Sequence, residues 1–235
     1  MADYRPTFSS NRLNALAKGI GAKTYLEIGV WKGDTFHNVD TALRIGVDPS
    51  PLFDWKASLN ASTHFHPMKS DQFFSSEAGR YRFDLAFIDG LHEYQQTLRD
   101  FFSTLALSRK HAIWVIDDTH PSDYFSAMPS QGQAFRGRAQ YGNESQAWHG
   151  DVFKVVLALH DFLPALSFCT IATGGNPQTL VWRQPRKGFK PRFGTLEAIG
   201  RADYFTFADN IDLFNLKPEE EALAEAIAGA NADGR

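Results

Sequence analysis

Short apolar runs alternate with amphipathic stretches along most of the chain. Five runs are rich in β-branched and aromatic residues and have the length of buried strands, at 24–28, 44–48, 62–68, 82–89 and 111–117. The first amphipathic stretch predicts a helix that begins near Ser10 or Asn11 and ends at Gly19 or Gly21. Strands that alternate with helices in this way indicate βαβ units around a parallel sheet.

Further helices are predicted from Asp34 to about Leu43, from Asp71 onward, and over 94–107 and 150–163. Two more β-rich runs, 167–173 and 179–184, flank a Gly-Gly-Asn-Pro turn, which predicts a hairpin and an antiparallel last strand. This order is typical of the class I methyltransferase fold. The expectation is a Rossmann-like, mostly parallel seven-stranded sheet with one antiparallel strand and helices on both faces.

Composition limits the partners of the chain. Lysine and arginine number 24 against 27 acidic residues, a net charge of −3, and no single basic run dominates, which argues against nucleic acid. A lone cysteine, Cys169, excludes an internal disulfide and argues against a cysteine metal site. No signal-peptide core or membrane-length apolar stretch is present. We expect a soluble cytoplasmic protein with a small-molecule acceptor and no membrane partner, and leave a homo-oligomer open.

Carboxylates follow every one of the five predicted parallel strands, at the sheet edge where doubly wound folds bind ligands. One aspartate in such a place is often only a cap or turn residue, but the whole series favours a binding site. The members of the series are Glu27, Asp48, Asp71, Asp89 and the pair Asp117 and Asp118.

The turn after the first strand reads E-x-G-x-x-x-G, from Glu27 through Gly29 to Gly33. Trp31 occupies the place where a dinucleotide fingerprint has its second glycine, so it blocks the close approach of a pyrophosphate. S-adenosylmethionine has no phosphate and carries a sulfonium and an ammonium, which a carboxylate such as Glu27 suits. The turn therefore favours S-adenosylmethionine over a nicotinamide dinucleotide.

Two later motifs extend this cofactor site. Asp48 lies about twenty residues further on, where a carboxylate accepts the ribose hydroxyls in bipartite nucleoside sites. Ser70 and Asp71 follow the third strand and would lie beside the adenine, although capping of the next helix explains them equally well.

The motifs YLEIGVWKGDTF, IGVDPSP, MKSDQFF, FDLAFIDGLHEYQQTLRD, DDTHP and WHGDVFKVV together resemble bacterial class I methyltransferases, in a branch similar to the macrocin O-methyltransferases. The resemblance covers roughly 25–182 and implies cofactor binding by Glu27, Gly29, Gly33 and Asp48. It also implies a methyltransferase domain over 1–184, and we expect the tail, 185–235, to pack on or beside it as part of one structural domain.

The acceptor side must align a nucleophile with the sulfonium and, for a hydroxyl, remove its proton. Candidate catalytic residues are Asp89, His92, Asp118 and His149, and Asp89 would also border the cofactor. Neighbouring parallel strands bring Asp89 beside Asp117 and Asp118, provided that the chain turns at Asp118. Such a cluster of carboxylates repels unless a cation neutralises it.

The same three aspartates, Asp89, Asp117 and Asp118, are candidate ligands for magnesium, which takes oxygen donors. The macrocin-like resemblance implies this metal set, yet many relatives carry His-Asp where this chain has Asp-Asp after the fifth strand. A metal site and a metal-free site with Asp118 or a histidine as the base both stay open.

We therefore predict an S-adenosylmethionine-dependent methyltransferase, acting on oxygen of a small sugar-related or secondary-metabolite acceptor. An NAD(P)-dependent oxidoreductase with a Rossmann-type sheet is one alternative, and a non-catalytic binding module that kept the fold is another. The segment Thr119–Gln146, rich in Gly, Ser, Pro and Gln, is long for a connection and is typical of a lid, a binding loop or a mobile segment.

Overall fold

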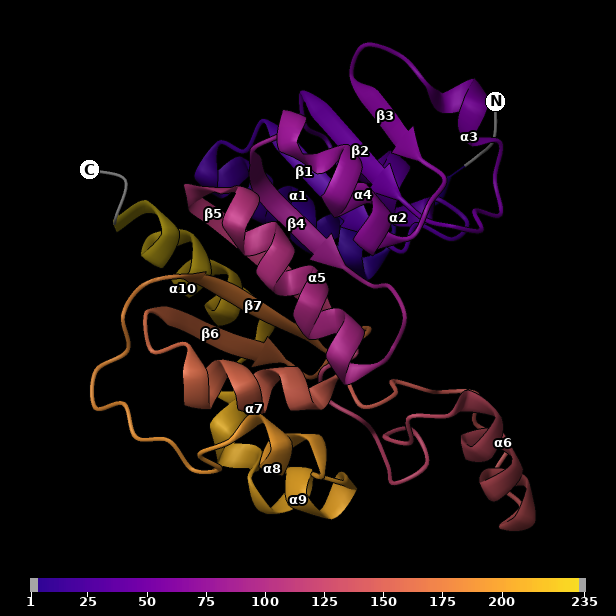
Figure 1. The fold of residues 1–235 in the computed structure, drawn as a ribbon, viewed down its shortest axis with the longest axis vertical. Coiled ribbons are helices and arrows are strands. Elements are labelled where there is room, and N and C mark those ends of the chain that lie inside the picture. The colour runs from indigo at the N-terminus through magenta and orange to yellow at the C-terminus, as the bar shows by residue number, and fades with distance from the viewer. Residues whose placement is uncertain (1–3, 233–235) are drawn as a thin grey trace.

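The computed structural model describes residues 4–232 and is built on one seven-stranded sheet of order β3-β2-β1-β4-β5-β7-β6 (Figure 1). Strands β1 to β5 run parallel, and β7 is antiparallel to both of its neighbours, β5 and β6. The mostly parallel sheet, the hairpin and its reversed strand are confirmed. The strands are β1 Thr24–Ile28, β2 Leu43–Val47, β3 Thr63–His66, β4 Phe83–Ile88, β5 Ser108–Asp117, β6 Leu166–Ile171 and β7 Gln178–Arg183.

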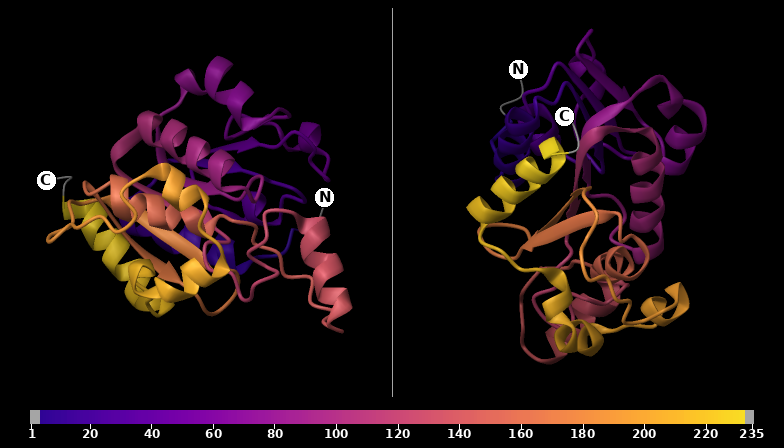
Figure 2. Two further views of the ribbon diagram at one scale, coloured as in Figure 1. Left: turned by 60° about the horizontal axis from the view of Figure 1, so that its bottom comes forward. Right: turned by 90° about the vertical axis from the view of Figure 1, so that its left-hand side faces the viewer.

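Helices cover both faces of the sheet, and one helix stands away from it (Figures 1 and 2). One face carries α4 Ser70–Ser76, α5 Tyr94–Leu107 and α7 Phe153–Phe162, with α8 Leu196–Gly200, the 3₁₀ turn Ile211–Phe214 and α9 Tyr204–Asp209 beside α7. The other face carries α1 Phe8–Ile20, α2 Asp34–Asn38 and α10 Glu219–Ala232. The remaining elements are α3 Trp55–Ser58 next to β3, the 3₁₀ turn Ala78–Arg80, and the separate α6 Gln131–Gln140.

The core has two layers because strand side chains alternate between the faces of the sheet. Along β5, Trp114 and Ile116 pack into the layer beneath α5 and α7. Ile113 and Val115 pack into the layer beneath α1 and α10. Burial on both sides explains why the central strands read as nearly continuous apolar runs.

Two helix boundaries differ from the sequence expectation. The N-cap of α1 is Thr7, whose hydroxyl accepts a hydrogen bond from the backbone N–H of Ser10, and the helix ends at Ile20 with Gly21, at a φ of 64°, as its C-cap. Helix α2 ends at Asn38 and does not continue to Leu43, because Val39 is extended. The Asn38 amide donates to the carbonyls of Asp34 and Tyr4, and this side-chain bonding competes with a further helical turn.

The C-terminal helix α10 begins with three glutamates, Glu219–Glu221, yet one of its faces is buried. Ala222, Ala226 and Ala230 are buried against the sheet and α1. A Cβ atom at Gly229 would lie 2.0 Å from the indole nitrogen of Trp182, so this position needs glycine for the helix to approach the strand. The boundary between 1–184 and 185–235 stays a prediction. Within residues 4–232, no helix combines the length and the apolarity that a bilayer crossing requires.

Arg12 connects three distant segments from inside the protein, where it is 1% exposed. Its Nε atom donates to Glu219 at the start of α10, 2.7 Å away. One Nη atom donates to the carbonyl of Asn176 and to the Gln178 side chain, and the other to two carbonyls of the β6–β7 turn. The guanidinium thereby fixes the turn that carries Asn176 toward the ligand-binding edge of the sheet.

Replacing Arg12 with methionine is expected to lower the free energy of unfolding by about 3–5 kcal/mol, because it leaves buried carbonyls and an amide without donors. Urea unfolding followed by circular dichroism measures the change. Arg5 is exposed, so Arg5→Met serves as the matched control and should stay within about 0.5 kcal/mol of the native protein. Equal unfolding midpoints for the two variants would show that the Arg12 network contributes nothing to stability.

Candidate functional site

A cavity of about 1090 Å³ opens at the carboxyl ends of β1, β2, β4 and β5. One half lies along the turns after β1 and β2 and the start of α4. The other half lies between the ends of β4 and β5 and the segment around α6. The lining includes Gly29, Trp31, Asp48, Lys69, Ser70, Asp71, Asp89, His92, Gln96, Asp100, Asp118, Gln131, Gln146, Trp148, His149 and Asn176.

Most of the residues singled out from the sequence line this one cavity. They are Gly29, Asp48, Ser70, Asp71, Asp89, His92, Asp118 and His149. Glu27, Gly33 and Asp117 are not among the lining residues, although they lie close in the chain to residues that are. The structure thus brings the predicted cofactor side and the predicted acceptor side together in one space.

The turn after β1 is held by the carboxylate of Asp48. Its Oδ2 atom accepts hydrogen bonds from the backbone N–H groups of Val30 and Trp31, at 2.9 and 2.8 Å, and Oδ1 accepts from Ser50 at 2.7 Å. A carboxylate offers about four acceptor sites, so one site is left for a ligand hydroxyl. Trp31 has a φ of 49°, which is rare for a residue other than glycine, and its side chain is 59% exposed.

Glu27 lies behind this turn. It is 2% exposed, and its carboxylate accepts a hydrogen bond from the Tyr25 hydroxyl at 2.5 Å. Burial, with Asp89 and Asp48 nearby, raises the pKa of Glu27 well above its usual value. Burial thus disfavours the charged form of Glu27, and Asp48 is the carboxylate of this turn that lines the cavity.

Gly33 precedes α2 and lies outside the cavity lining. Its φ is 85°, and a Cβ atom there would lie 2.9 Å from the His37 ring, so the residue serves the start of the helix. The cofactor role expected for Gly33 from the sequence stays a prediction.

A polar group that the sequence did not reveal lies near Ser70 and Asp71. The Gln96 amide donates to Ser70 and Asp71, and to Asp100 at 3.0 Å. Burial raises the pKa of Asp100 to about 6. Gln96 and Asp100 are four residues apart on α5, a spacing that places both on one face of a helix and was the available signal.

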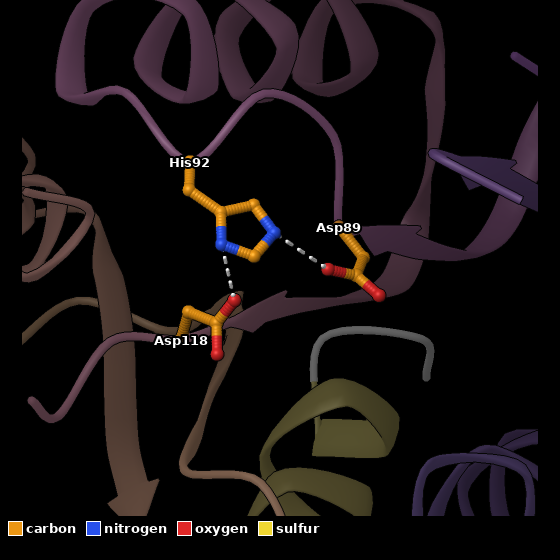
Figure 3. Close-up of side chains that lie close together, drawn as sticks. All are labelled: Asp89, His92 and Asp118. Atoms are coloured by element: carbon orange, nitrogen blue, oxygen red, sulfur yellow. Dashed lines mark ion pairs between the residues drawn. The ribbon is translucent and has the colours of Figure 1, made fainter. Parts of the chain in front are cut away.

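His92 lies between two carboxylates at the ends of β4 and β5 (Figure 3). Its Nδ1 atom is 2.9 Å from Asp118 and its Nε2 atom 3.6 Å from Asp89. Burial by itself lowers the pKa of His92, but the hydrogen bonds and charges of Asp118 and Asp89 raise it to about 11. His92 is therefore a cation at neutral pH and neutralises part of the acidic cluster.

The chain turns at Asp118, as the convergence of the aspartates required. Asp118 has a φ of 59°, whereas Asp117 is the last residue of β5. Asp117 is buried and accepts a hydrogen bond from the Asn176 amide at 3.2 Å, and its other oxygen has no partner among the described residues. Burial, with the charges of Asp89 and Asp118, raises the pKa of Asp117 well above its usual value and so disfavours its charged form.

The donor atoms that lie close enough for a shared cation belong to Asp89, His92 and Asp118, whose ligand atoms lie within 4.8 Å of one another. Across residues 4–232 this is the one such group, and it has His92 where the sequence suggested Asp117. Two carboxylates and an imidazole suit a divalent ion that accepts nitrogen better than they suit magnesium. The unpartnered oxygen of Asp117 lies beside this group. Magnesium binding by Asp89, Asp117 and Asp118 stays a prediction.

His92 lies in the loop before α5 and not in the first turn of that helix. The loop is tied to the segment before α7 by Asp151, which accepts a hydrogen bond from the first backbone N–H of α5, at Tyr94. Asp151 therefore caps α5 and not its own helix. His149 lies 3.7 Å from Asp118, and burial lowers the pKa of His149, which favours the neutral imidazole.

The tail begins with several basic residues, within 186–192, which do not line this cavity. They border a separate hollow of about 610 Å³, through Arg186, Lys187, Lys190 and Arg192, and this hollow shares no lining residue with the large cavity. Arg186 and Arg192 are engaged by backbone carbonyls and by Asp212. In the aromatic segment 203–214 of the tail, Phe207 and Phe214 are buried with their ring centroids 5.0 Å apart, so these two rings serve packing.

Comparisons with known proteins found a family match in the first half of the chain and solved structures with a similar fold. Residues 26–119 match a family model described as a methyltransferase domain. The fold is similar to that of a Klebsiella pneumoniae protein described as an O-methyltransferase, with TM-score 0.53 and 17% identity over 78% of this chain and 84% of that one. A Podospora anserina methyltransferase bound to S-adenosylhomocysteine gives TM-score 0.54 and 14% identity over 78% and 80%.

A Bacillus cereus O-methyltransferase, also solved with S-adenosylhomocysteine, gives TM-score 0.50 and 16% identity over 77% of this chain and 84% of that one. The search of curated proteins found no significant match. At these identities the structural likeness concerns the fold, and it confirms the Rossmann-like architecture expected from the order of the elements.

Proposed function

We infer that this chain, whose residues 26–119 match a methyltransferase-domain model, transfers a methyl group from S-adenosylmethionine to a hydroxyl oxygen of a small, uncharged acceptor. One observation carries the inference. The cavity joins the β1 turn and Asp48 at one end to the Asp89–His92–Asp118 cluster at the other. A cofactor held at the first end would direct its sulfonium toward an acceptor at the second.

Support for the cofactor comes from the residues of the first half and from the relatives. The turn presents the Asp48 carboxylate, which has an acceptor site to spare for a ribose hydroxyl, while the backbone N–H groups of Val30 and Trp31 are already bonded to that carboxylate and are not free for a pyrophosphate. Two of the similar solved structures hold S-adenosylhomocysteine, the product that methyl transfer leaves behind. Asp48, Ser70 and Asp71 are the proposed contacts to the nucleoside.

The acceptor half supports an uncharged, hydroxyl-bearing substrate. Its lining presents the amides of Gln131, Gln146 and Asn176 and the ring of Trp148, groups that pair with hydroxyls and pack on ring faces. Among the residues that line the cavity, Lys69 is the single lysine or arginine, and it lies at the cofactor end. More specifically, we propose a sugar-related or secondary-metabolite acceptor, as in the macrocin-like branch.

Proton removal is assigned to Asp118. His92 keeps its own proton because its pKa is raised to about 11, so it holds Asp118 and Asp89 in place and does not act as a base. The Oδ1 atom of Asp118 faces neutral His149 at 3.7 Å and is the atom that receives the acceptor proton. A divalent ion, if bound, would have to displace the His92 proton; Asp89, His92 and Asp118 would then hold the ion, which would lower the pKa of the acceptor hydroxyl.

Calorimetry with S-adenosylmethionine, S-adenosylhomocysteine and NADH tests the cofactor. Saturable binding is expected for the first two, with a Kd in the micromolar range, and none for NADH. Binding of NADH alone would overturn the proposal in favour of an oxidoreductase. A non-catalytic binding module would bind the cofactor yet transfer no methyl group.

A second measurement tests the acceptor. The protein is incubated with methyl-tritiated S-adenosylmethionine and a panel of neutral glycosides and phenols, each paired with its phosphate ester. Transfer is expected to the neutral members and not to the esters. Transfer to the esters alone would contradict an uncharged acceptor. Absence of transfer to every member, with cofactor bound, would contradict the acceptor class and favour the binding module.

A further inference from the structure

We propose that Arg138 is a positioning residue that fixes the wall of the acceptor half without contacting the acceptor. The wall is the segment 146–149, from which Gln146, Trp148 and His149 line the cavity. Arg138 belongs to α6 and is absent from the cavity lining. The proposal rests on the proposed function for its catalytic meaning, but its structural content concerns this segment alone.

The Arg138 guanidinium is buried, with 1% exposure, and clamps two stretches of chain. One Nη atom lies 2.8 Å from each carboxylate oxygen of Asp123. The other Nη atom donates to the carbonyls of Ser145 and Ala147, directly before Trp148. A planar guanidinium can make all these bonds at once, whereas a lysine ammonium is a single point charge on a flexible stem.

Asp123 also restrains the wall at His149, through Ser126. Its Oδ1 atom also accepts the backbone N–H of Ser126 at 2.7 Å, and the Ser126 carbonyl accepts the backbone N–H of His149 at 2.9 Å. The Trp148 indole donates to the carbonyl of Met128 at 2.7 Å. Trp148 and His149 are therefore fixed from both directions by a network that Arg138 and Asp123 close.

The wall in turn touches the catalytic cluster. The Trp148 ring stacks on the His92 ring, with centroids 5.0 Å apart and an interplanar angle of 12°. A Cβ atom at Gly150 would lie 1.8 Å from the His92 carbonyl oxygen, so the two backbones are in close contact there. A shift of 147–150 would thus move the imidazole that holds Asp89 and Asp118.

The position of α6 makes this role separable from folding. The helix stands apart from the sheet and its covering helices (Figure 2), and none of its residues belongs to either core layer. Its two buried residues, Ala134 and Arg138, are buried locally. Loosening it should disturb the acceptor wall and leave the cofactor half intact. Replacement of a residue that served stability alone would not disturb the acceptor wall selectively and would affect the cofactor half as well.

The experiment compares Arg138→Lys and Asp123→Asn with Arg136→Lys, an exposed arginine on the same helix. Hydrogen exchange followed by mass spectrometry is expected to speed up about tenfold or more over 145–149 in the first two variants, and to stay native in β1, β4 and the control. The ring-current shift that Trp148 imposes on the His92 protons, read by NMR, should shrink in the same two variants.

S-adenosylhomocysteine binding, measured by calorimetry, should remain within about twofold of the native value in all three variants. Native exchange over 145–149 together with a native His92 resonance in Arg138→Lys and Asp123→Asn would overturn the proposal. Equal changes in Arg136→Lys would overturn it as well. If the native protein fails to bind S-adenosylhomocysteine, the proposed function fails, while the exchange and NMR results still decide the role of Arg138.

Discussion

Asp118→Asn is expected to lower the methyl-transfer rate by about 10²–10⁴-fold, because it removes the carboxylate that receives the acceptor proton and holds His92. Asparagine keeps the size of the side chain and tolerates the positive φ of this position, so the fold should be retained. The rate is measured with tritium-labelled S-adenosylmethionine and the panel acceptor that the native protein uses fastest. Cofactor binding, measured by calorimetry, should change by no more than about twofold because Asp118 lies in the acceptor half of the cavity and the proposed nucleoside contacts lie in the other half.

The neighbouring residue provides the matched control. Burial and nearby charges raise the pKa of Asp117 well above its usual value, which disfavours its charged form, so Asp117→Asn should lower the rate by less than about tenfold. A loss in Asp117→Asn as large as in Asp118→Asn would instead support the three-aspartate magnesium site. That outcome would have to be accompanied by loss of activity in a chelator and its recovery on adding magnesium.

Gly29→Ala is expected to destabilise the protein by about 3 kcal/mol or more and to abolish cofactor binding. Gly29 has a φ of 85°, and a Cβ atom there would lie 1.9 Å from the carbonyl oxygen of Asp89. Backbone atoms cannot move aside as a flexible side chain does, so β1 and β4 would have to separate at their ends. Urea unfolding and calorimetry with S-adenosylhomocysteine measure the two effects.

Gly21→Ala separates the backbone strain from the steric overlap. Gly21 also has a positive φ, 64°, but no other group lies within 4 Å of the position that a Cβ atom would take there, so only the conformational cost of about 1 kcal/mol should appear. Equal losses of stability in the two variants would show that the approach of the Asp89 backbone to Gly29 is unimportant. Normal cofactor binding in Gly29→Ala would contradict the place of this turn in the site.

The order of the elements and the residue types at the strand ends could be predicted from the sequence because both depend on local patterns. A run such as Phe83–Ile88 must be buried on both faces, and Asp89 must then leave the sheet at its ligand-binding edge. Five successive runs of this kind, with a hairpin after them, leave few sheets other than the one observed. The cavity lining therefore contains most of the residues that these rules select.

Tertiary structure decided what each carboxylate does. Glu27 and Asp48 both follow the pattern, but burial raises the pKa of the first and keeps it out of the cavity lining, while the second holds the turn with an acceptor site to spare. Asp117 and Asp118 are adjacent in sequence, yet the turn at Asp118 sends one toward Asn176 and the other toward His92. Charge and direction depend on neighbours that are distant in the chain, which no local pattern encodes.

The acceptor side depended most on the fold. The segment Thr119–Gln146 reads as a polar loop, and its composition does not single out Arg138 from the arginine two residues earlier. The fold brings Asp123, Ser145 and Ala147 around the buried Arg138 guanidinium, and these hydrogen bonds make part of the loop a wall of the acceptor half. The sequence by itself determined the sheet and its cofactor edge, because strand burial and turn chemistry are local. Tertiary structure decided the acceptor wall, because long-range hydrogen bonds to a buried charge define it.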